Sequence, residues 1–206
     1  MRIRTILAAA AVPAALAASL LGTTAASATN PPPPPVGTIA IKTAAQADAL
    51  SGTTINKNVD IPASVTQAKN VWLSYIHITG RLTVEGVVTM AGDTVDGNTY
   101  VSGPGSFLGL TNQASHFKRN LTVQNSSGIY TGGPGTTSFG NWTQYAGADL
   151  PTAVSQVDGS FTFINNSGGL YSGYPMHVTG GFTYTGNTGP VLDRGGLNVD
   201  GQQNIS

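Results

Sequence analysis

The 206-residue chain contains no cysteine, so a disulfide framework and thiolate metal sites are excluded. Only 9% of its residues are charged, and nine basic residues balance nine acidic ones. Such a chain has neither the basic patch that nucleic acids require nor the polybasic segment that binds anionic lipid. Leucine is scarce while glycine, threonine, serine and asparagine are abundant, which favours strands and turns. We therefore expect stability from packing and backbone hydrogen bonds, and no nucleic-acid partner.

Residues 1–28 are typical of a secretory signal peptide. A short basic start (MRIRT) precedes an alanine-rich apolar run and the small residues Ala26, Ser27 and Ala28. Cleavage after Ala28 would remove Arg2 and Arg4, leaving seven basic residues against nine acidic ones. The remainder of the sequence has no second long apolar run, which predicts no membrane association after cleavage. We expect a secreted, extracellular protein, with the cell wall as a candidate location.

Two short segments follow the predicted cleavage site. Residues 29–37 (TNPPPPPVG) predict a polyproline II linker, which fits a stiff stalk better than a ligand for a proline-binding module. Residues 38–52 predict an N-terminal cap that contains a short helix over 43–52, with Thr43 capping its start and Gly52 ending it. A repeat array needs such a cap because its terminal repeat would otherwise expose the core.

An internal repeat of about 21 residues fills the rest of the chain, residues 53–206. It is clearest in VDGSFTFINNSG (157–168) and VTGGFTYTGNTG (178–189). One turn position recurs eight times, at Lys57, Gly80, Gly97, Arg119, Gly140, Gly159, Gly180 and Gly201. Six of the eight are glycine, as expected at a turn where φ can be positive, while Lys57 and Arg119 indicate that the turn is not left-handed in every coil. Eight recurrences predict about eight coils.

The residues around the turn show the pattern of half-buried strands. Apolar residues recur two positions before the turn, two positions after it and four positions after it; around Gly159 these are Val157, Phe161 and Phe163. The position between the last two is mostly polar, as at Thr162, and the residues at one such position in all coils are called a column. Stacked coils would bury the apolar columns in one interior. A leucine-rich repeat would need leucine at most fixed positions and an asparagine ladder, and its second segment would be helical. The pattern instead predicts an all-β fold, a right-handed parallel β-helix.

Two sets of titratable residues are candidates for a metal site or a catalytic site. His77, His116 and His177 all lie three residues before the turn, on coils 2, 4 and 7 of the eight-coil register. Backbones about 10 and 14 Å apart, at about 4.8 Å per coil, are too far apart for one tetrahedral ion.

The second set, Asp96, Asp158 and Asp200, lies on coils 3, 6 and 8, and no two of these coils are adjacent. A calcium-dependent lyase needs carboxylates on adjacent coils, and a glycosidase needs a carboxyl pair about 5–10 Å apart. The sequence therefore predicts outward polar stacks, with no catalytic residue, no metal and no cofactor.

Aromatic residues give the clearest indication of binding. Tyr100 interrupts the outward threonine column, and Tyr130, Tyr171 and Tyr174 lie in similar loops. Exposed tyrosines among asparagine and threonine are candidate glycan-contacting residues, although rings that simply pack along the second face fit the pattern as well.

The phrases VDGSFTFINNSG, VTGGFTYTGNTG and LNVDGQQN resemble small exported actinobacterial proteins with repeats of the form x-V-x-G-N-h-T-h, where h is apolar. The resemblance covers about residues 53 to 206 and implies a right-handed parallel β-helix of unassigned function. Many proteins of that kind carry cysteine near the end of the array, and this chain has none. The opening IAIKTAAQADALSGTTINKNVDI also looks like the start of receptor-L-domain cell-wall proteins.

The sequence predicts a secreted, non-enzymatic β-solenoid, a structural or surface-interaction module of the extracellular space. The array stops in a predicted strand at Ile205, where unpaired backbone groups would favour end-to-end self-association. The alternative is a carbohydrate-binding or weakly carbohydrate-active β-helix, similar to polysaccharide lyases, whose partner would be a cell-wall or extracellular polysaccharide.

Overall fold

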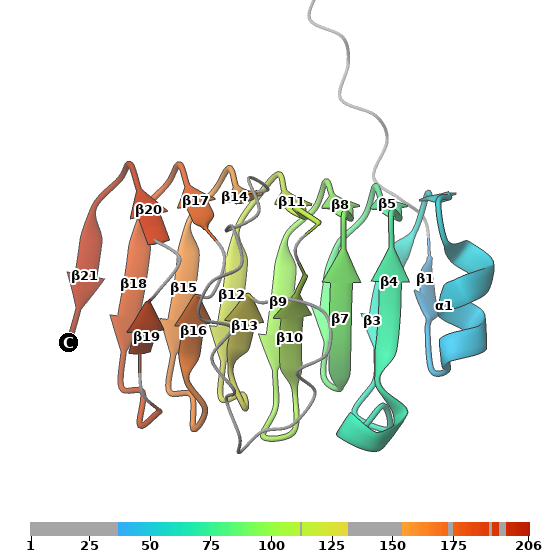
Figure 1. The fold of residues 1–206 in the computed structure, drawn as a ribbon, viewed down its shortest axis with the longest axis horizontal. Coiled ribbons are helices and arrows are strands. Elements are labelled where there is room, and N and C mark those ends of the chain that lie inside the picture. The colour runs from blue at the N-terminus through green and yellow to red at the C-terminus, as the bar shows by residue number, and fades with distance from the viewer. Residues whose placement is uncertain (1–36, 112, 132–153, 173–174, 190, 194–196) are drawn as a thin grey trace, which may run out of the picture. The chain divides into compact units, whose positions relative to one another are not determined.

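A computed structural model of the chain describes residues 37–111, 113–131, 154–172, 175–189, 191–193 and 197–206. These residues belong to one compact unit, residues 34–206. The predicted signal peptide, and all of the predicted linker except Gly37, lie outside the described residues. The fold is all-β, a stack of parallel strands with one short α-helix near its N-terminal end (Figure 1).

The strands form three parallel sheets, called here sheets A, B and C. Sheet A contains β1 (Thr38–Ala40), β3 (Asn58–Ile61), β6 (Leu82–Val84), β9 (Thr99–Ser102), β12 (Leu121–Gln124), β15 (Phe161–Ile164), β18 (Phe182–Thr185) and β21 (Gln203–Ile205). Sheet B contains β2 (Thr54–Ile55), β5 (His77–Ile78), β8 (Thr94–Val95), β11 (His116–Phe117), β14 (Ser155–Val157), β17 (Met176–Val178) and β20 (Leu197–Val199). Sheet C contains β4 (Val71–Ser74), β7 (Val87–Ala91), β10 (Phe107–Leu110), β13 (Ile129–Thr131), β16 (Leu170–Ser172) and β19 (Val191–Asp193).

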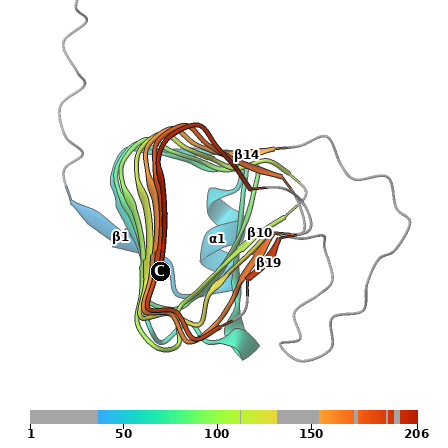
Figure 2. The same ribbon diagram turned by 90° about the vertical axis from the view of Figure 1, so that its left-hand side faces the viewer.

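The chain visits sheets B, A and C in that order on every turn, which gives six three-strand turns from β2 to β19. Strands β20 and β21 begin a seventh turn. Viewed from the C-terminal end, the chain winds counterclockwise as it advances toward the viewer, so the solenoid is right-handed (Figure 2). The parallel β-helix predicted from the repeat is therefore confirmed.

The predicted number of eight coils is wrong, because the coil assigned to Gly140 does not stand between its neighbours. Strand β11 pairs directly with β14, and β12 pairs directly with β15. Residues 132–153, which contain Gly140, lie outside the described residues. Thr122 is thus the register neighbour of Thr162, and the fourth turn stacks on the fifth without an intervening rung.

The predicted apolar columns form the core. Phe161 pairs with Phe182 in sheet A, and Phe163 pairs with Tyr184. The ring centroids of these pairs lie 5.3 and 5.6 Å apart, within the range of favourable aromatic contacts. The polar column, represented by Thr122, stays partly exposed on the outer side of the same strands. Alternation along sheet A therefore matches the pattern read from the sequence.

The turn glycines serve a different purpose from the one predicted. Gly97 and Gly180 do not have positive φ values. Their N–H groups instead donate to the carbonyl oxygens of Gly80 and Gly159 on the preceding turn, at 3.0 Å in both cases. A Cβ at either position would come within 2.5 Å of that carbonyl oxygen. Glycine is required here because successive turns approach closely, not because of the backbone dihedral.

The predicted N-terminal helix is present as α1 (Ala44–Leu50). The hydroxyl of Thr43 accepts a hydrogen bond from the Gln46 N–H at 3.2 Å, and Gly52 has a positive φ of 70°. Ala47 of α1 is buried in the core cluster. The segment before the helix adds β1, which pairs with β3 and was not predicted as a strand.

Polar side chains also stack inside the corner between sheets A and C. Asn166 is buried, and its amide oxygen accepts from the N–H and the hydroxyl of Ser126 on the preceding turn. Its amide nitrogen donates to Val123 O and to the side chain of Asn187 on the following turn. This short asparagine ladder, which the sequence reading did not anticipate, satisfies backbone groups that the corner leaves without sheet partners.

Candidate functional site

The three histidines and three aspartates singled out in the sequence lie together on the outer side of sheet B. His77, His116 and His177 occupy turns 2, 4 and 6, because the register joins β11 directly to β14. The aspartates follow on the turns between and after them: Asp96, Asp158 and Asp200 lie on turns 3, 5 and 7. The predicted spacing of coils 2, 4 and 7 for histidine and 3, 6 and 8 for aspartate is therefore wrong.

In the observed register each histidine lies next to an aspartate. The predicted register already placed His77 beside Asp96 and His177 beside Asp200, and the direct pairing of β11 with β14 adds His116 beside Asp158. The Nε2 atom of His77 lies 2.9 Å from Asp96 Oδ2, that of His116 lies 2.8 Å from Asp158 Oδ2, and that of His177 lies 2.9 Å from Asp200 Oδ2. We call these three pairs the His–Asp ladder. Each pair joins two successive turns of the solenoid, and all of the side chains are partly exposed, between 31% and 55%.

Asp96 is the most strongly bound of the three carboxylates. Its Oδ1 lies 2.8 Å from Lys118 Nζ on the next turn, so one carboxylate bridges turns 2, 3 and 4. Partial burial acts to raise the pKa of Asp96, but the hydrogen bonds and positive charges of Lys118 and His77 outweigh burial and lower it. Asp158 receives a second hydrogen bond at 2.6 Å from Gln156, whereas Asp200 is 55% exposed.

The ladder holds short strands together. Strands β5, β8 and β11 contain two residues each, so few backbone hydrogen bonds connect the turns on this face. In the part of the chain that the structure describes, no three histidine, aspartate or glutamate side chains gather as metal ligands. The ladder is therefore suited to clamping adjacent turns.

A groove lies at the corner where each sheet A strand turns into the following sheet C strand. We call it the corner groove. It has a volume of about 450 Å³ and is lined by Ala63, Val65, Thr66, Gln67, Val87, Gly105, Phe107, Ser127, Ser167 and Gly168. These residues come from five successive turns, so the groove follows the solenoid axis for about 19 Å at about 4.8 Å per turn.

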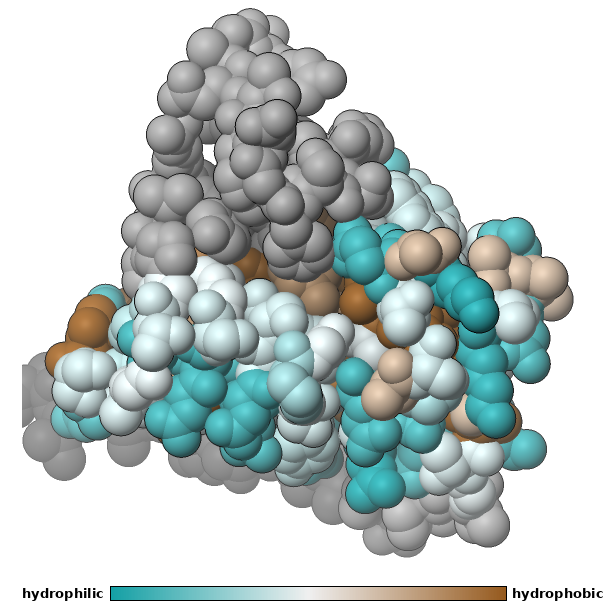
Figure 3. Space-filling view, turned by 90° about the horizontal axis from the view of Figure 1, so that it is seen from below, coloured by the Kyte–Doolittle hydropathy of each residue, from teal (hydrophilic) through white to brown (hydrophobic). Residues whose placement is uncertain are grey.

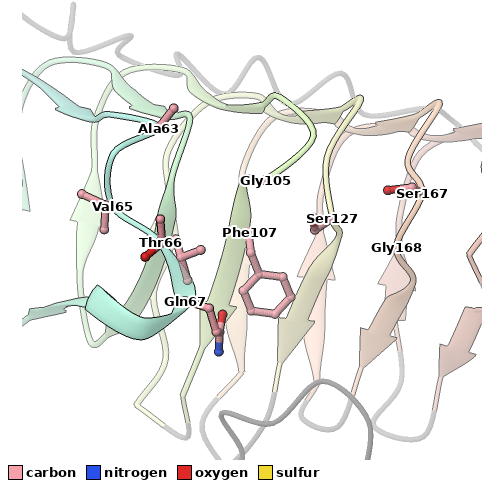
Figure 4. A pocket seen from close by; sticks show the side chains of 10 residues that line it. Ala63, Val65, Thr66, Gln67, Gly105, Phe107, Ser127, Ser167 and Gly168 are labelled. Carbon is pink, nitrogen blue, oxygen red and sulfur yellow. The ribbon is translucent and has the colours of Figure 1, made fainter.

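The described residues that line the corner groove are uncharged, and the largest side chain among them is aromatic. Figure 4 shows the half-buried ring of Phe107 in the groove, with Gln67 on one side and Ser127 on the other. None of the ten lining residues is acidic, basic or histidine. Viewed from this side of the molecule, apolar surface is visible within a mostly hydrophilic face (Figure 3).

Three of the four tyrosines predicted as glycan-contacting residues lie among the described residues, on two different sheets. Tyr100 lies on sheet A, is 38% exposed, and its hydroxyl accepts a hydrogen bond from Asn98 at 3.3 Å. Tyr130 and Tyr171 are register neighbours on β13 and β16 of sheet C. Tyr174 lies outside the described residues. Trp72, which was not singled out, is 38% exposed on β4 of sheet C.

A buried carboxyl group was also missed. Asp93 is 1% exposed, and its two carboxylate oxygens accept from the N–H groups of Ile76 and Ala91 at 2.7 and 2.8 Å. Desolvation by burial raises its pKa from 3.8 to about 7, although both hydrogen bonds act to lower it. Ser115 and Ser155 continue the same interior column, each accepting from a backbone N–H of the turn before. A lone aspartate directly before a strand gave no sequence signal of burial.

Comparison with known proteins gives no relative: no family model, no curated protein and no solved structure matches the chain. Among the described residues, no helix has the length and apolar character needed to cross a membrane.

Proposed function

We propose that this chain is an exported, non-catalytic β-solenoid that acts as an interaction module outside the cell, with cell-wall or extracellular polysaccharide as its partner. The signal-like residues 1–28 and the proline-rich linker support export. The observation that carries the interaction role is the corner groove, which crosses five turns, contains an aromatic ring and has only uncharged side chains among its described lining residues.

The positions of the titratable groups support binding over catalysis. The side chains most suited to general acid or base chemistry, the histidines of the ladder, already contact aspartates at 2.8–2.9 Å on sheet B. The corner groove lies at the junction of sheets A and C and has no titratable side chain among its ten lining residues. Binding and acid–base groups thus occupy different parts of the surface.

Fractionation and sedimentation test this proposal together. We expect the expressed protein in the medium or wall fraction with Thr29 as its N-terminal residue, and we expect the purified protein to sediment with insoluble cell-wall polysaccharide. We expect no release of reducing ends or unsaturated products during the incubation. Retention in the cytoplasm would contradict export, absence of sedimentation would contradict the interaction role, and cleavage products would favour the carbohydrate-active alternative.

A further inference from the structure

We propose that the corner groove binds a neutral, linear polysaccharide that lies parallel to the solenoid axis, with Phe107 as its stacking platform. This inference deepens the function proposed above and rests on it. The structure brings the residues of this groove together from five turns, and the described ones differ from the four tyrosines that the sequence predicts as glycan-contacting.

The charge of the groove favours an uncharged ligand. The lining residues are apolar, hydroxyl-bearing, amide-bearing or glycine, and none of the ten carries a charge at neutral pH. An anionic polymer would lose part of its hydration here without gaining a cationic partner, which costs free energy. The ion pairs lie on sheet B, between residues such as Asp96 and Lys118.

The backbone of the groove argues against an extended peptide. A peptide bound by strand addition needs unpaired main-chain groups. The N–H groups of Val87, Phe107 and Ser127 instead donate to carbonyl oxygens of the preceding turn, at 2.9 Å in each case. The N–H of Ser167 does the same at 3.1 Å. These N–H groups are therefore not available for strand addition, which favours recognition by side chains.

The side chains match the two kinds of surface that a sugar ring presents. The ring of Phe107 offers an apolar face for the C–H groups of a pyranose. The hydroxyl of Ser127 donates to Pro104 O at 2.8 Å, and that of Ser167 donates to Ser126 O at 3.2 Å. Each serine oxygen then retains lone pairs that can accept from ligand hydroxyl groups.

Gly105 lines the groove close to Phe107 and leaves open space beside its backbone. A Cβ at Gly105 would meet no atom within 4 Å. A Cβ at Gly109 would lie in ordinary contact with Phe107 Cε1 at 3.7 Å and would approach Thr89 Oγ1 closely, at 3.2 Å. Gly105 therefore offers a position where a side chain can be added to obstruct the groove without removing a contact.

Calorimetric titration of the purified protein with cellohexaose, laminarihexaose and chitohexaose tests the inference. We expect at least one of these neutral hexasaccharides to bind. We expect Phe107→Ala to weaken binding roughly five- to tenfold, as loss of one aromatic contact implies. Gly105→Glu should weaken it at least as much, and Phe107→Tyr should retain most of the affinity.

The matched control is Tyr100→Ala, which removes an aromatic ring that is 38% exposed on sheet A, away from the groove. We expect it to leave the Kd within twofold. Unchanged binding in both Phe107→Ala and Gly105→Glu would overturn the inference, as would preferential binding of hexagalacturonate or of an uncharged decapeptide. If the protein sediments with wall polysaccharide but binds none of the three hexasaccharides, this inference fails and the interaction role stands. If it does neither, both fail.

Discussion

Single residues in this solenoid carry consequences that the repeat pattern alone does not show, and Asp93 is the clearest example. Its pKa of about 7 exceeds the usual value of 3.8. Between these two pH values the Asp93 carboxyl is protonated in the folded state and ionised in the unfolded chain. The resulting stabilisation is complete below about pH 4 and is lost as the pH rises through about 7.

We therefore expect the free energy of unfolding to fall between about pH 4 and pH 7 because of Asp93. The variant Asp93→Ser, which matches Ser115 and Ser155 in the same column, should lack this contribution. Urea unfolding of both proteins across the range measures the difference. Parallel pH profiles for the two proteins would contradict the assignment.

The stacked glycines give a second prediction at the residue scale. A Cβ at Gly97 would lie 2.5 Å from Gly80 O, whereas a Cβ at Gly105 would meet nothing within 4 Å. We expect Gly97→Ala to destabilise the fold by about 1–3 kcal/mol, as overpacking does. The matched control Gly105→Ala should change stability by no more than about 0.5 kcal/mol in thermal unfolding. Equal effects at the two positions would show that close approach of the turns is not the constraint.

At the scale of elements, the His–Asp ladder strengthens a sheet of very short strands. Because its side chains are about one-third to one-half exposed, each pair should contribute less than about 1 kcal/mol. We expect Asp96→Asn to lower the free energy of unfolding more than Asp200→Asn does. Asp96 contacts both His77 and Lys118, whereas Asp200 is 55% exposed.

Chemical denaturation of the three single variants, Asp96→Asn, Asp158→Asn and Asp200→Asn, measures this order. Phe163→Ala serves as the comparison for a buried core residue, and we expect it to lower the free energy of unfolding by about 3–5 kcal/mol. A loss above about 2 kcal/mol for Asp200→Asn would contradict the interpretation of the ladder as a surface clamp.

The elements also show where sequence reasoning succeeds. Period-two alternation depends only on local pattern, so the columns through Val157, Phe161 and Thr162 could be placed correctly from the sequence. The capping role of Thr43 is likewise local. The corner groove could not be placed, because its residues come from five turns and are brought together only by the stacking.

The incorrect prediction of eight coils is explained at the scale of the whole molecule. Arg119 and Gly159 are 40 residues apart, close to two repeat periods, and Gly140 stands near the middle. Periodicity cannot distinguish a coil from an insertion of similar length, because strand pairing is a non-local property. The pairing of β12 with β15 shows that no coil intervenes, and it places His116 beside Asp158 and Ser127 beside Ser167 along the groove.

The direct stacking of the fourth turn on the fifth is therefore the central claim, and the absence of native cysteine makes it easy to test. Thr122 and Thr162 are register neighbours, and the Cα atoms of adjacent parallel strands lie about 4.8 Å apart, within disulfide range.

We predict that Thr122→Cys combined with Thr162→Cys forms an intramolecular disulfide under mild oxidation, detected by mass spectrometry of the digested protein. The control pair, Thr122→Cys with Thr183→Cys, lies two turns apart and should stay reduced. A disulfide between Thr122→Cys and Thr143→Cys, with none in the first pair, would restore the eight-coil register and contradict the account.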